Sequence, residues 1–246
     1  MLSKAQSKYI RSLSLQKFRK ENNAFIAEGD KIVREWLVSA SNIQMIVAVE
    51  EWTAQNLALI SKHTDASVHI VSEEILQSVS TLNTANKVLL VVHMPKQDTP
   101  LPTDEWCLVL DDIQDPGNVG TIIRIADWFG INHVVASPAS ADFYNPKVIQ
   151  AAMGGHLRVH LHHAQLLDFL SDFKAPILAA ALNGDNIYQF KNTGSAALLI
   201  GNESKGLSPE LLNMATKKLT IPRQGGAESL NAAVSTGIIC ALLKPC

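Results

Sequence analysis

Several signatures that would assign a familiar class of protein are absent from this chain of 246 residues. It holds only three cysteines, Cys107, Cys240 and Cys246, and no C-x-x-C pair, so neither a disulfide framework nor a cysteine-based zinc site is indicated. No apolar segment near the N-terminus has the pattern of a signal peptide, and the apolar runs are far shorter than a membrane span. These absences predict a soluble protein of the cytoplasm.

The common nucleotide-binding and hydrolase motifs are missing as well. There is no G-x-x-x-x-G-K-[ST], no G-x-G-x-x-G after a strand and no G-x-S-x-G, so a P-loop nucleotidase and a serine hydrolase are disfavoured. The histidines of HLHH, His160, His162 and His163, suggest a metal, but no acid or cysteine accompanies them. We therefore predict no metal site and interpret these residues as exposed histidines at the end of a strand.

What the chain does have is an apolar composition and an uneven charge. Hydrophobic residues make up 47% and charged residues 18%, which is enough apolar material for a folded core. The first twenty residues carry six basic side chains and no acid, whereas the rest holds 15 basic against 23 acidic residues, a net charge of −8. This basic arm indicates an anionic partner, with a solvated helix face as the alternative.

A proline-bearing segment divides the chain into two α/β parts. The sequence MPKQDTPLPT at 94–103 is typical of a linker, so we predict a first domain over 1–94, a linker over 95–104 and a second domain over 105–246. In the first domain the hydrophobic pattern predicts helices at 3–20, 28–39, 54–62 and 73–79 and strands at 43–49, 68–71 and 87–92.

The second domain alternates short apolar strands with helices, which predicts a mostly parallel sheet covered on both faces. The predicted strands are 107–110, 133–136, 158–161, 177–181, 197–200 and 218–221, and the predicted helices are 119–129, 146–153, 164–173, 208–214 and 230–243. Ligands of such sheets bind at the carboxyl ends of the strands. Polar, glycine-rich segments follow the strands at 111–120, 182–185, 201–206 and 222–231.

Three short motifs occupy these segments. They are N-x-G-x-x-x-R with Asn118, Gly120 and Arg124; G-x-E-x-x-G with Gly201, Glu203 and Gly206; and I-P-x(6)-S-L-N with Ile221, Pro222, Ser229, Leu230 and Asn231. Taken singly, each has an ordinary structural explanation. Asn118 and Asn231 are typical helix caps, and Arg124 is spaced to form a surface pair with Asp127 worth only about 0.2–0.5 kcal/mol.

Taken together and in this order, the motifs are specific. The segments DPGNVGTIIRIADWFG, LIGNESKGLSPELL and IPRQGGAESLNAAVSTGI resemble the three motifs of the SpoU (TrmH-like) family of RNA ribose 2′-O-methyltransferases, in the SPOUT superfamily. The likeness is strong over 106–243. The first half, notably AFIAEGDKIVREWL, is similar to the substrate-binding domain of that family, which has a ribosomal-protein-like RNA-binding fold.

The resemblance implies a catalytic sheet with a trefoil knot, which holds S-adenosyl-L-methionine bent in its loops. Knots are nearly absent from proteins, so the resemblance alone carries this expectation. By position, the cofactor is expected at Ala180, Gly201, Ile221 and Leu230. The expected catalytic residues are Arg124, Asn118, Glu203, Ser229 and Asn231, and the expected RNA contacts in the basic arm are Lys17, Arg19 and Lys20.

Arg124 fits this chemistry because a forked guanidinium grips a phosphate with two hydrogen bonds. The family assigns the arginine as a general base as well, yet arginine side chains stay protonated in proteins. Whether Arg124 acts as a literal base or only stabilises the developing alkoxide therefore stays open.

The family also implies a homodimer in which the first motif of one subunit completes the site of the other. Ribosomal RNA is the favoured substrate, with transfer RNA as the alternative. A non-catalytic RNA-binding factor on the same fold and a methyltransferase for small molecules are the rival functions, disfavoured by the complete motif set and by the basic arm.

Overall fold

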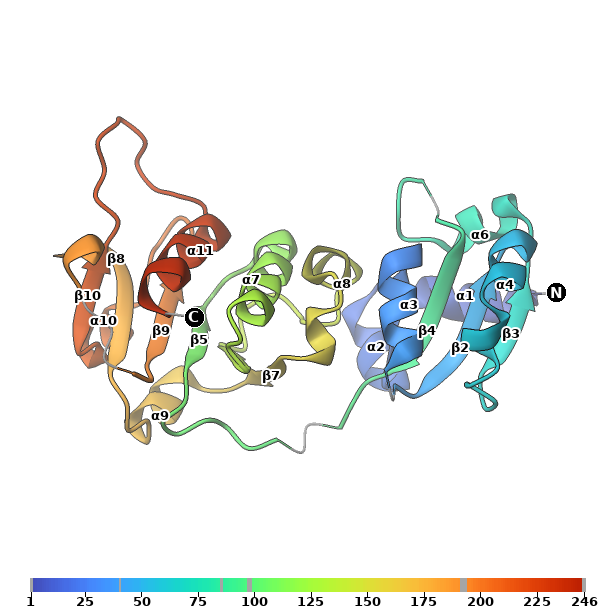
Figure 1. The fold of residues 1–246 in the computed structure, drawn as a ribbon, viewed down its shortest axis with the longest axis horizontal. Coiled ribbons are helices and arrows are strands. Elements are labelled where there is room, and N and C mark those ends of the chain that lie inside the picture. The colour runs from blue at the N-terminus through green and yellow to red at the C-terminus, as the bar shows by residue number, and fades with distance from the viewer. Residues whose placement is uncertain (1, 40, 85, 97–98, 191–193, 245–246) are drawn as a thin grey trace. The chain divides into compact units, whose positions relative to one another are not determined.

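Two β-sheets, each with its own helices, divide the chain into two compact units (Figure 1). The computed structural model describes all residues except 1, 40, 85, 97–98, 191–193 and 245–246. The first unit comprises Met1–Lys96 and Tyr144–Leu157, and the second comprises Gln97–Phe143 and Arg158–Cys246. The predicted α/β class is confirmed.

The sheet of the first unit has the order β1-β4-β2-β3 in the described part of the chain. The pair β2/β3 is parallel, whereas β4 runs antiparallel to both β1 and β2. The pattern did not predict β1, whose five residues are all buried and show no alternation for a period-two signal. The strands are β1 Ala24–Glu28, β2 Ile43–Ala48, β3 Ser67–Ile70 and β4 Val88–His93.

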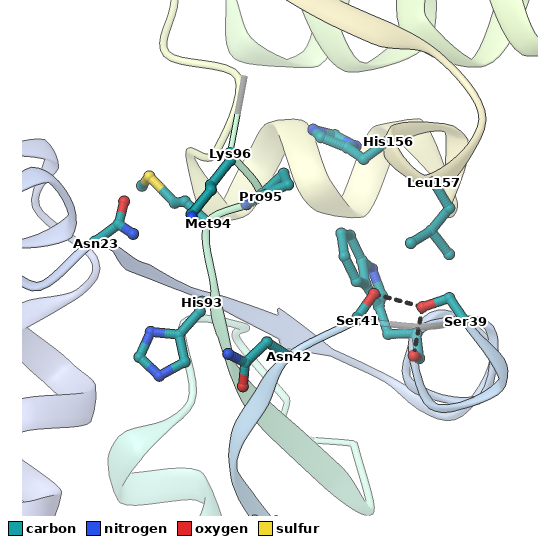
Figure 2. A pocket seen from close by; sticks show the side chains of 11 residues that line it. Asn23, Ser39, Ser41, Asn42, His93, Met94, Pro95, Lys96, His156 and Leu157 are labelled. Carbon is teal, nitrogen blue, oxygen red and sulfur yellow. Dashed lines mark hydrogen bonds between the residues drawn. The ribbon is translucent and has the colours of Figure 1, made fainter. Parts of the chain in front are cut away.

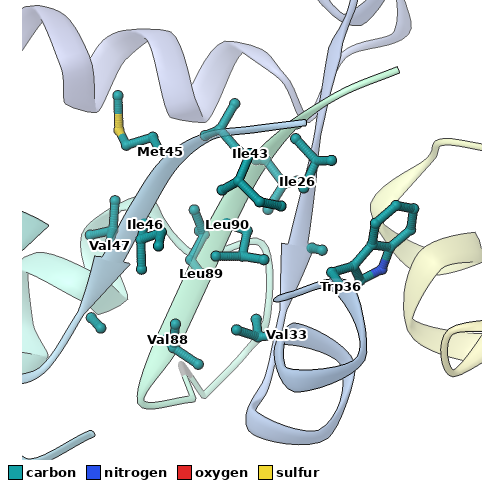
Figure 3. Close-up of a cluster of buried hydrophobic side chains, with 14 of the residues drawn as sticks. Ile26, Val33, Trp36, Ile43, Met45, Ile46, Val47, Val88, Leu89 and Leu90 are labelled. Carbon is teal, nitrogen blue, oxygen red and sulfur yellow. The ribbon is translucent and has the colours of Figure 1, made fainter. Parts of the chain in front are cut away.

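The helices of the first unit cover an apolar core formed by these strands. Val33 of α3 packs with side chains of β1, β2 and β4, such as Ile26, Ile46 and Leu90 (Figure 3). The predicted helix over 3–20 is two helices, because the chain turns between Ser12 and Gln16. The helices are α1 Lys4–Ser12, α2 Gln16–Asn22, α3 Asp30–Val38, α4 Glu50–Gln55, α5 Leu57–Ile60 and α6 Glu73–Val79.

A short segment from the second half of the sequence completes this unit. It consists of helix α8, Pro146–Ala152, and the 3-10 turn η1, Gly155–Leu157. Ile149 belongs to the apolar core, and the Gln150 side chain donates a 2.8 Å hydrogen bond to the carbonyl of Glu28. Packing therefore groups 144–157 with the first unit, whereas the predicted division at 94 and 105 followed the linker composition alone.

The second unit holds a parallel sheet of order β10-β8-β9-β5-β6-β7 in the described residues. This agrees with the predicted mostly parallel sheet. Two strands differ from the prediction by more than one residue: β7 begins and ends two residues later, and β8 continues to Asn186 because it pairs again with β10 beyond a bulge. The strands are β5 Cys107–Asp111, β6 His133–Ala136, β7 His160–His163, β8 Ile177–Asn186, β9 Ala197–Gly201 and β10 Lys217–Thr220.

Helices pack on this sheet in two groups. Apolar residues of α9, Leu166–Ser171, and α10, Pro209–Met214, form one cluster with β5, β8 and β9. Helix α7, Pro116–Trp128, contacts β6 and packs beside α11, Ala232–Leu243, which contacts β9 and the turn η2, Ile187–Gln189 (Figure 1). Among the described residues, no helix combines the length and hydrophobicity that crossing a membrane requires.

One residue of the basic arm, Arg19, differs from the prediction. Lys17 and Lys20 are exposed on α2, but Arg19 is only 1% exposed. Its guanidinium donates hydrogen bonds to the carbonyls of Leu13 and Ser14, at 2.9 and 2.8 Å. Arg19 therefore holds the turn between α1 and α2, and its burial argues against the predicted RNA contact.

Replacing this arginine should destabilise the first unit. Arg19→Ala removes a charged donor from two buried or half-buried carbonyls, so we expect the free energy of unfolding to fall by about 2 kcal/mol. Lys17→Ala, which removes an exposed charge on the same helix, should change it by less than about 0.5 kcal/mol. Urea unfolding followed by circular dichroism measures both; equal midpoints would contradict the structural role.

Candidate active site

The three motifs meet at one edge of the parallel sheet. Asp111 at the end of β5 pairs with Gly201 at the end of β9, and both strands run in the same direction. The segments that follow these strands, together with the segment 221–231 after β10, therefore leave the sheet at its carboxyl edge. The segment after β10 loops out before it enters α11 (Figure 1).

Helix α7 starts at this edge because its first turn is capped. The Asp115 side chain accepts a 2.8 Å hydrogen bond from the backbone N–H of Asn118. Pro116 occupies the first helical turn, where a backbone N–H is not needed for an intrahelical hydrogen bond. The apolar face of the helix, which includes Val119 and Ile123, is buried. This arrangement places the Asn118 side chain at the sheet edge, where it is 9% exposed.

The segment after β9 is a tight turn that Gly201 makes possible. A Cβ atom on Gly201 would lie 2.3 Å from the backbone of Gly206, and Gly206 itself has φ +71°. Asn202 closes the turn, since its carbonyl accepts from the Gly206 amide at 2.8 Å and its side chain accepts from the amide of Ser204 at 2.9 Å. Any side chain at position 201 would therefore distort this turn, whether or not a ligand is bound.

The side chain of Asn118 joins all three motifs. Its amide nitrogen donates to Glu203 Oε1 at 2.5 Å, and its amide oxygen accepts from Asn231 Nδ2 at 2.8 Å. Asn231 also caps α11, because its Oδ1 accepts from the backbone amides of Ala233 and Val234. One amide thus connects the start of α7, the turn after β9 and the start of α11.

Two further contacts, which the sequence analysis did not predict, fix the same loops. Asp111 Oδ2 accepts from the amide of Ser208 at 2.8 Å, and the Asn202 side chain donates to the carbonyl of Asp112 at 2.8 Å. Asp112 adopts φ 55°, a conformation that asparagine and aspartate tolerate better than most residues. In the sequence, both contacts are marked only by a polar residue at the end of a buried strand. The residue that each one contacts lies about ninety positions away, so the sequence does not reveal the pairing.

Arg124 and Ser229 stand outside this network. Arg124 is exposed on α7, about 9 Å further along the helix axis than Asn118 and turned by about 120°. Within the described part of the chain it has no hydrogen-bond or ion-pair partner, and the same holds for the exposed Ser229. The alternative explanation of Arg124, a surface pair with Asp127, does not hold, because Asp127 bonds Arg158 at 2.8 Å instead.

The residues predicted to hold a cofactor lie at three adjacent strands. In β8, Ala179 is the last residue that pairs with β9. Ala180 comes next and begins the stretch in which the pairing of β8 with β10 changes register. Gly201 ends β9, and Ile221 follows β10 directly. The predicted loop at 182–185 is instead part of β8, with Leu182 72% exposed. Leu230, in the segment before α11, is 46% exposed.

The histidines of β7 belong to a cluster away from this edge. His133 Nδ1 and His162 Nε2 are 3.2 Å apart, and both residues are buried, so the prediction of exposed histidines holds for His160 and His163 only. Burial lowers the pKa of His162 to about 4 and lowers that of His133 as well. Both rings are therefore neutral at pH 7. No group of three potential metal ligands occurs among the described residues.

The α/β fold with its parallel sheet is that of a class of RNA methyltransferases, as comparison with known proteins shows. The SpoU rRNA Methylase family matches residues 105–241, and an MRM3-like substrate binding domain matches residues 4–90. The chain belongs to the SpoU rRNA Methylase family.

Individual relatives match nearly the whole chain. A 23S rRNA (guanosine(2553)-2′-O)-methyltransferase of Bacillus subtilis (strain 168), RlmP, is 32% identical over 93% of this chain and 92% of its own length. A TrmH-family protein structure from Porphyromonas gingivalis superimposes with a TM-score of 0.86 at 37% identity, covering 99% of this chain and 98% of the other. An AdoMet-bound rRNA methyltransferase of Sinorhizobium meliloti gives 0.86 at 27% identity, with 98% and 95% covered.

The Asn118 network is open to a structural test. Asn118→Leu keeps the volume of the side chain but removes both of its hydrogen bonds, so we expect unfolding to become easier by about 2 kcal/mol. Amide exchange at 202–206 and in the first turn of α11 should accelerate. Thr121→Val, which alters only a bond to the carbonyl of Gly117 on the same helix, is the control. Hydrogen-exchange mass spectrometry measures this effect. Parental protection of these segments in the Asn118→Leu variant would contradict the network.

Proposed function

We propose that this chain transfers a methyl group from S-adenosyl-L-methionine to a ribose 2′-hydroxyl of ribosomal RNA. The observation that carries the proposal is the Asn118 side chain, which ties the three motif segments together at the carboxyl edge of the sheet. Relatives that match over the full length support the substrate, since they are named as rRNA methyltransferases. For the tRNA alternative, a solved structure concerned with methylation of tRNA covers 57% of this chain, and a relative named as a tRNA/rRNA methyltransferase covers 94%.

The cofactor is assigned to Ala180, Gly201, Ile221 and Leu230. The residues present fit such a group: exposed leucine side chains at 182 and 230 offer apolar cover, and the ends of β8, β9 and β10 offer backbone groups. When bound, S-adenosyl-L-methionine supplies an electrophilic methyl group on a sulfonium. The trefoil knot belongs to this proposal too, and the passage of the chain from edge strand β10 to α11 over β9 is compatible with it.

The roles of the protein side chains follow from their contacts. Arg124 carries a permanent charge with no partner in the described chain, so it is available to grip a phosphate and to stabilise the alkoxide that forms as the hydroxyl loses its proton. Asn118 and Glu203 hold the loop after β9 in place. Asn231 positions Asn118 and the start of α11, and Ser229, exposed beside it, is assigned a polar contact with the ribose.

A homodimer explains why Arg124 points away from the other motif residues. Trp128, one turn further along α7, is 83% exposed, and Val234 and Leu242 of the neighbouring helix α11 are 52% and 42% exposed. Apolar side chains this exposed on two packed helices are typical of a surface that a partner covers. We propose that a second copy packs there and that Arg124 of one subunit completes the site of the other.

A cytoplasmic location accompanies this proposal. The described cysteines, Cys107 and Cys240, are buried free thiols, which is usual for proteins of a reducing compartment.

Substitution of Arg124 should separate catalysis from cofactor binding. Arg124→Ala should reduce methyl transfer at least about a hundredfold, because the charge that stabilises the alkoxide is gone, and should leave cofactor affinity within about twofold. Arg124→Lys should restore little, since a point charge lacks the fork. Tritium transfer to ribosomal RNA and calorimetry with S-adenosyl-L-methionine measure the two effects. Parental turnover in the alanine variant would remove Arg124 from the proposed mechanism.

Mixed dimers test whether the site is shared. Arg124→Ala and Glu203→Ala, each inactive alone, should regain activity when co-expressed, because a heterodimer would keep one intact site. With random pairing the recovery should be about one quarter of the parental activity. Co-expression of Arg124→Ala with Arg124→Ala/Glu203→Ala is the control and should stay inactive. If the first mixture is inactive as well, Arg124 acts within its own subunit.

A further inference from the structure

A hollow that contains none of the motif residues lies in the first unit. It has a volume of about 540 Å³ and lies where the ends of α2, α3, β4 and η1 meet the turn before β2 (Figure 2). The residues that matter for its chemistry are Asn23, Trp36, Asn42, His93, Lys96 and His156. Its volume falls in the range of small-molecule sites, roughly 300–1,000 Å³, which is ample for one nucleobase.

Trp36 is the unusual residue of this hollow. Its side chain is only 3% exposed, yet its indole nitrogen has no hydrogen-bond acceptor among the described residues. The ring packs edge-on against Phe25, at 5.2 Å between centroids, and lies on the side of the 144–157 segment (Figure 3). A buried N–H without an acceptor is costly, and most buried indoles find one. Trp36 therefore places an unused N–H donor in the wall of the hollow.

The remaining lining groups favour an anionic, hydrogen-bonding ligand. Lys96 is exposed at the rim, and His93 and His156 contribute imidazoles. None of the eleven lining residues that the structure describes is acidic. Asn23 and Asn42 are exposed, and their side-chain amides, which can both donate and accept, form no hydrogen bond to the described chain. Asn23 lies beside Met94 and Asn42 beside His93, because the backbones of each pair are hydrogen-bonded (Figure 2).

The hollow also continues the basic surface of the arm. Asn23 caps the C-terminus of α2, one turn after the exposed Lys20 and two turns after Lys17. An RNA strand whose phosphates follow these lysines would reach Asn23 and Lys96 within a few nucleotides. The position of the hollow in a unit that matches a substrate binding domain agrees with this path.

We infer that this hollow binds an unpaired nucleobase of the RNA substrate. The base packs against the imidazoles of His93 and His156, its edge hydrogen-bonds the amides of Asn23 and Asn42, and the adjoining phosphate pairs with Lys96. Unpaired bases expose the edges and faces that such a site reads, whereas a duplex hides them. The hollow thereby makes a bulge or loop part of target choice. The inference rests on the proposed function, because it concerns the same RNA.

The test uses the full chain labelled with 5-fluorotryptophan. The ¹⁹F signal that is missing from the spectrum of the Trp36→Phe variant is assigned to Trp36. Addition of a single-stranded heptanucleotide RNA should shift that ¹⁹F signal, and an RNA duplex of the same sequence should not. Asn42→Ala/Lys96→Ala should weaken the affinity for the single strand at least about tenfold, as expected from the loss of contacts to one base and its phosphate. Lys31→Ala/Asn83→Ala, which alters the same residue types near the start of α3 and in the segment between α6 and β4, should change it by less than about twofold.

The outcomes separate this inference from the proposed function. If the pocket variant binds single-stranded RNA like the control variant, or if the Trp36 signal does not move, the inference is overturned even where the parent still methylates ribosomal RNA. If the signal moves and affinity falls, but the parent methylates no RNA, the pocket stands and the proposed activity fails. A Trp36 shift with the duplex alone would also overturn the inference.

Discussion

The amide of Asn118 is the contact on which the arrangement of the candidate site depends. It donates to Glu203 and accepts from Asn231, so a single neutral side chain satisfies a carboxylate from one loop and an amide from another. A carboxylate in its place would repel Glu203, and an apolar group would leave both neighbours without this partner. Because Asn231 also caps α11 and Asp115 also caps α7, the network sets where both helices begin. Loop position and helix position are thereby fixed together.

Outside this network, the candidate site presents polar side chains to solvent. Asn118 is buried, Glu203 is half-buried and Asn231 is exposed, and hydrogen bonds join the three, whereas Arg124 and Ser229 face solvent. Such a division suits a reaction with a weak nucleophile, where rigid loops position a small ligand and a charged side chain meets a large, anionic substrate. The exposed side chain of Trp128, one turn from Arg124, is consistent with the second subunit proposed above.

In the first unit, basic residues that are neighbours in the sequence have different roles in the structure. Lys17, Arg19 and Lys20 form one basic cluster along the chain, yet Arg19 turns inward to hold two carbonyls while the lysines stay in solvent. A long side chain with several donors can satisfy the open carbonyls at a helix end, and spacing alone cannot tell this use from a phosphate contact. Similarly, Asn23, Trp36 and His156 are far apart in sequence and became neighbours only through the packing of the 144–157 segment with the first unit.

The sequence by itself determined the α/β class, the parallel character of the second sheet and the identity of the three motifs, because hydrophobic periodicity and turn residues are local signals. It missed β1, whose five buried residues carry no alternation, and it ended β8 too early, because pairing with β10 beyond a bulge is a property of two strands. Only the tertiary structure decided that Asn118, Glu203 and Asn231 share hydrogen bonds, that Arg124 stays apart from them, and that Arg19 is structural. Each of these depends on the direction of a side chain relative to residues distant in the chain, which no local pattern encodes.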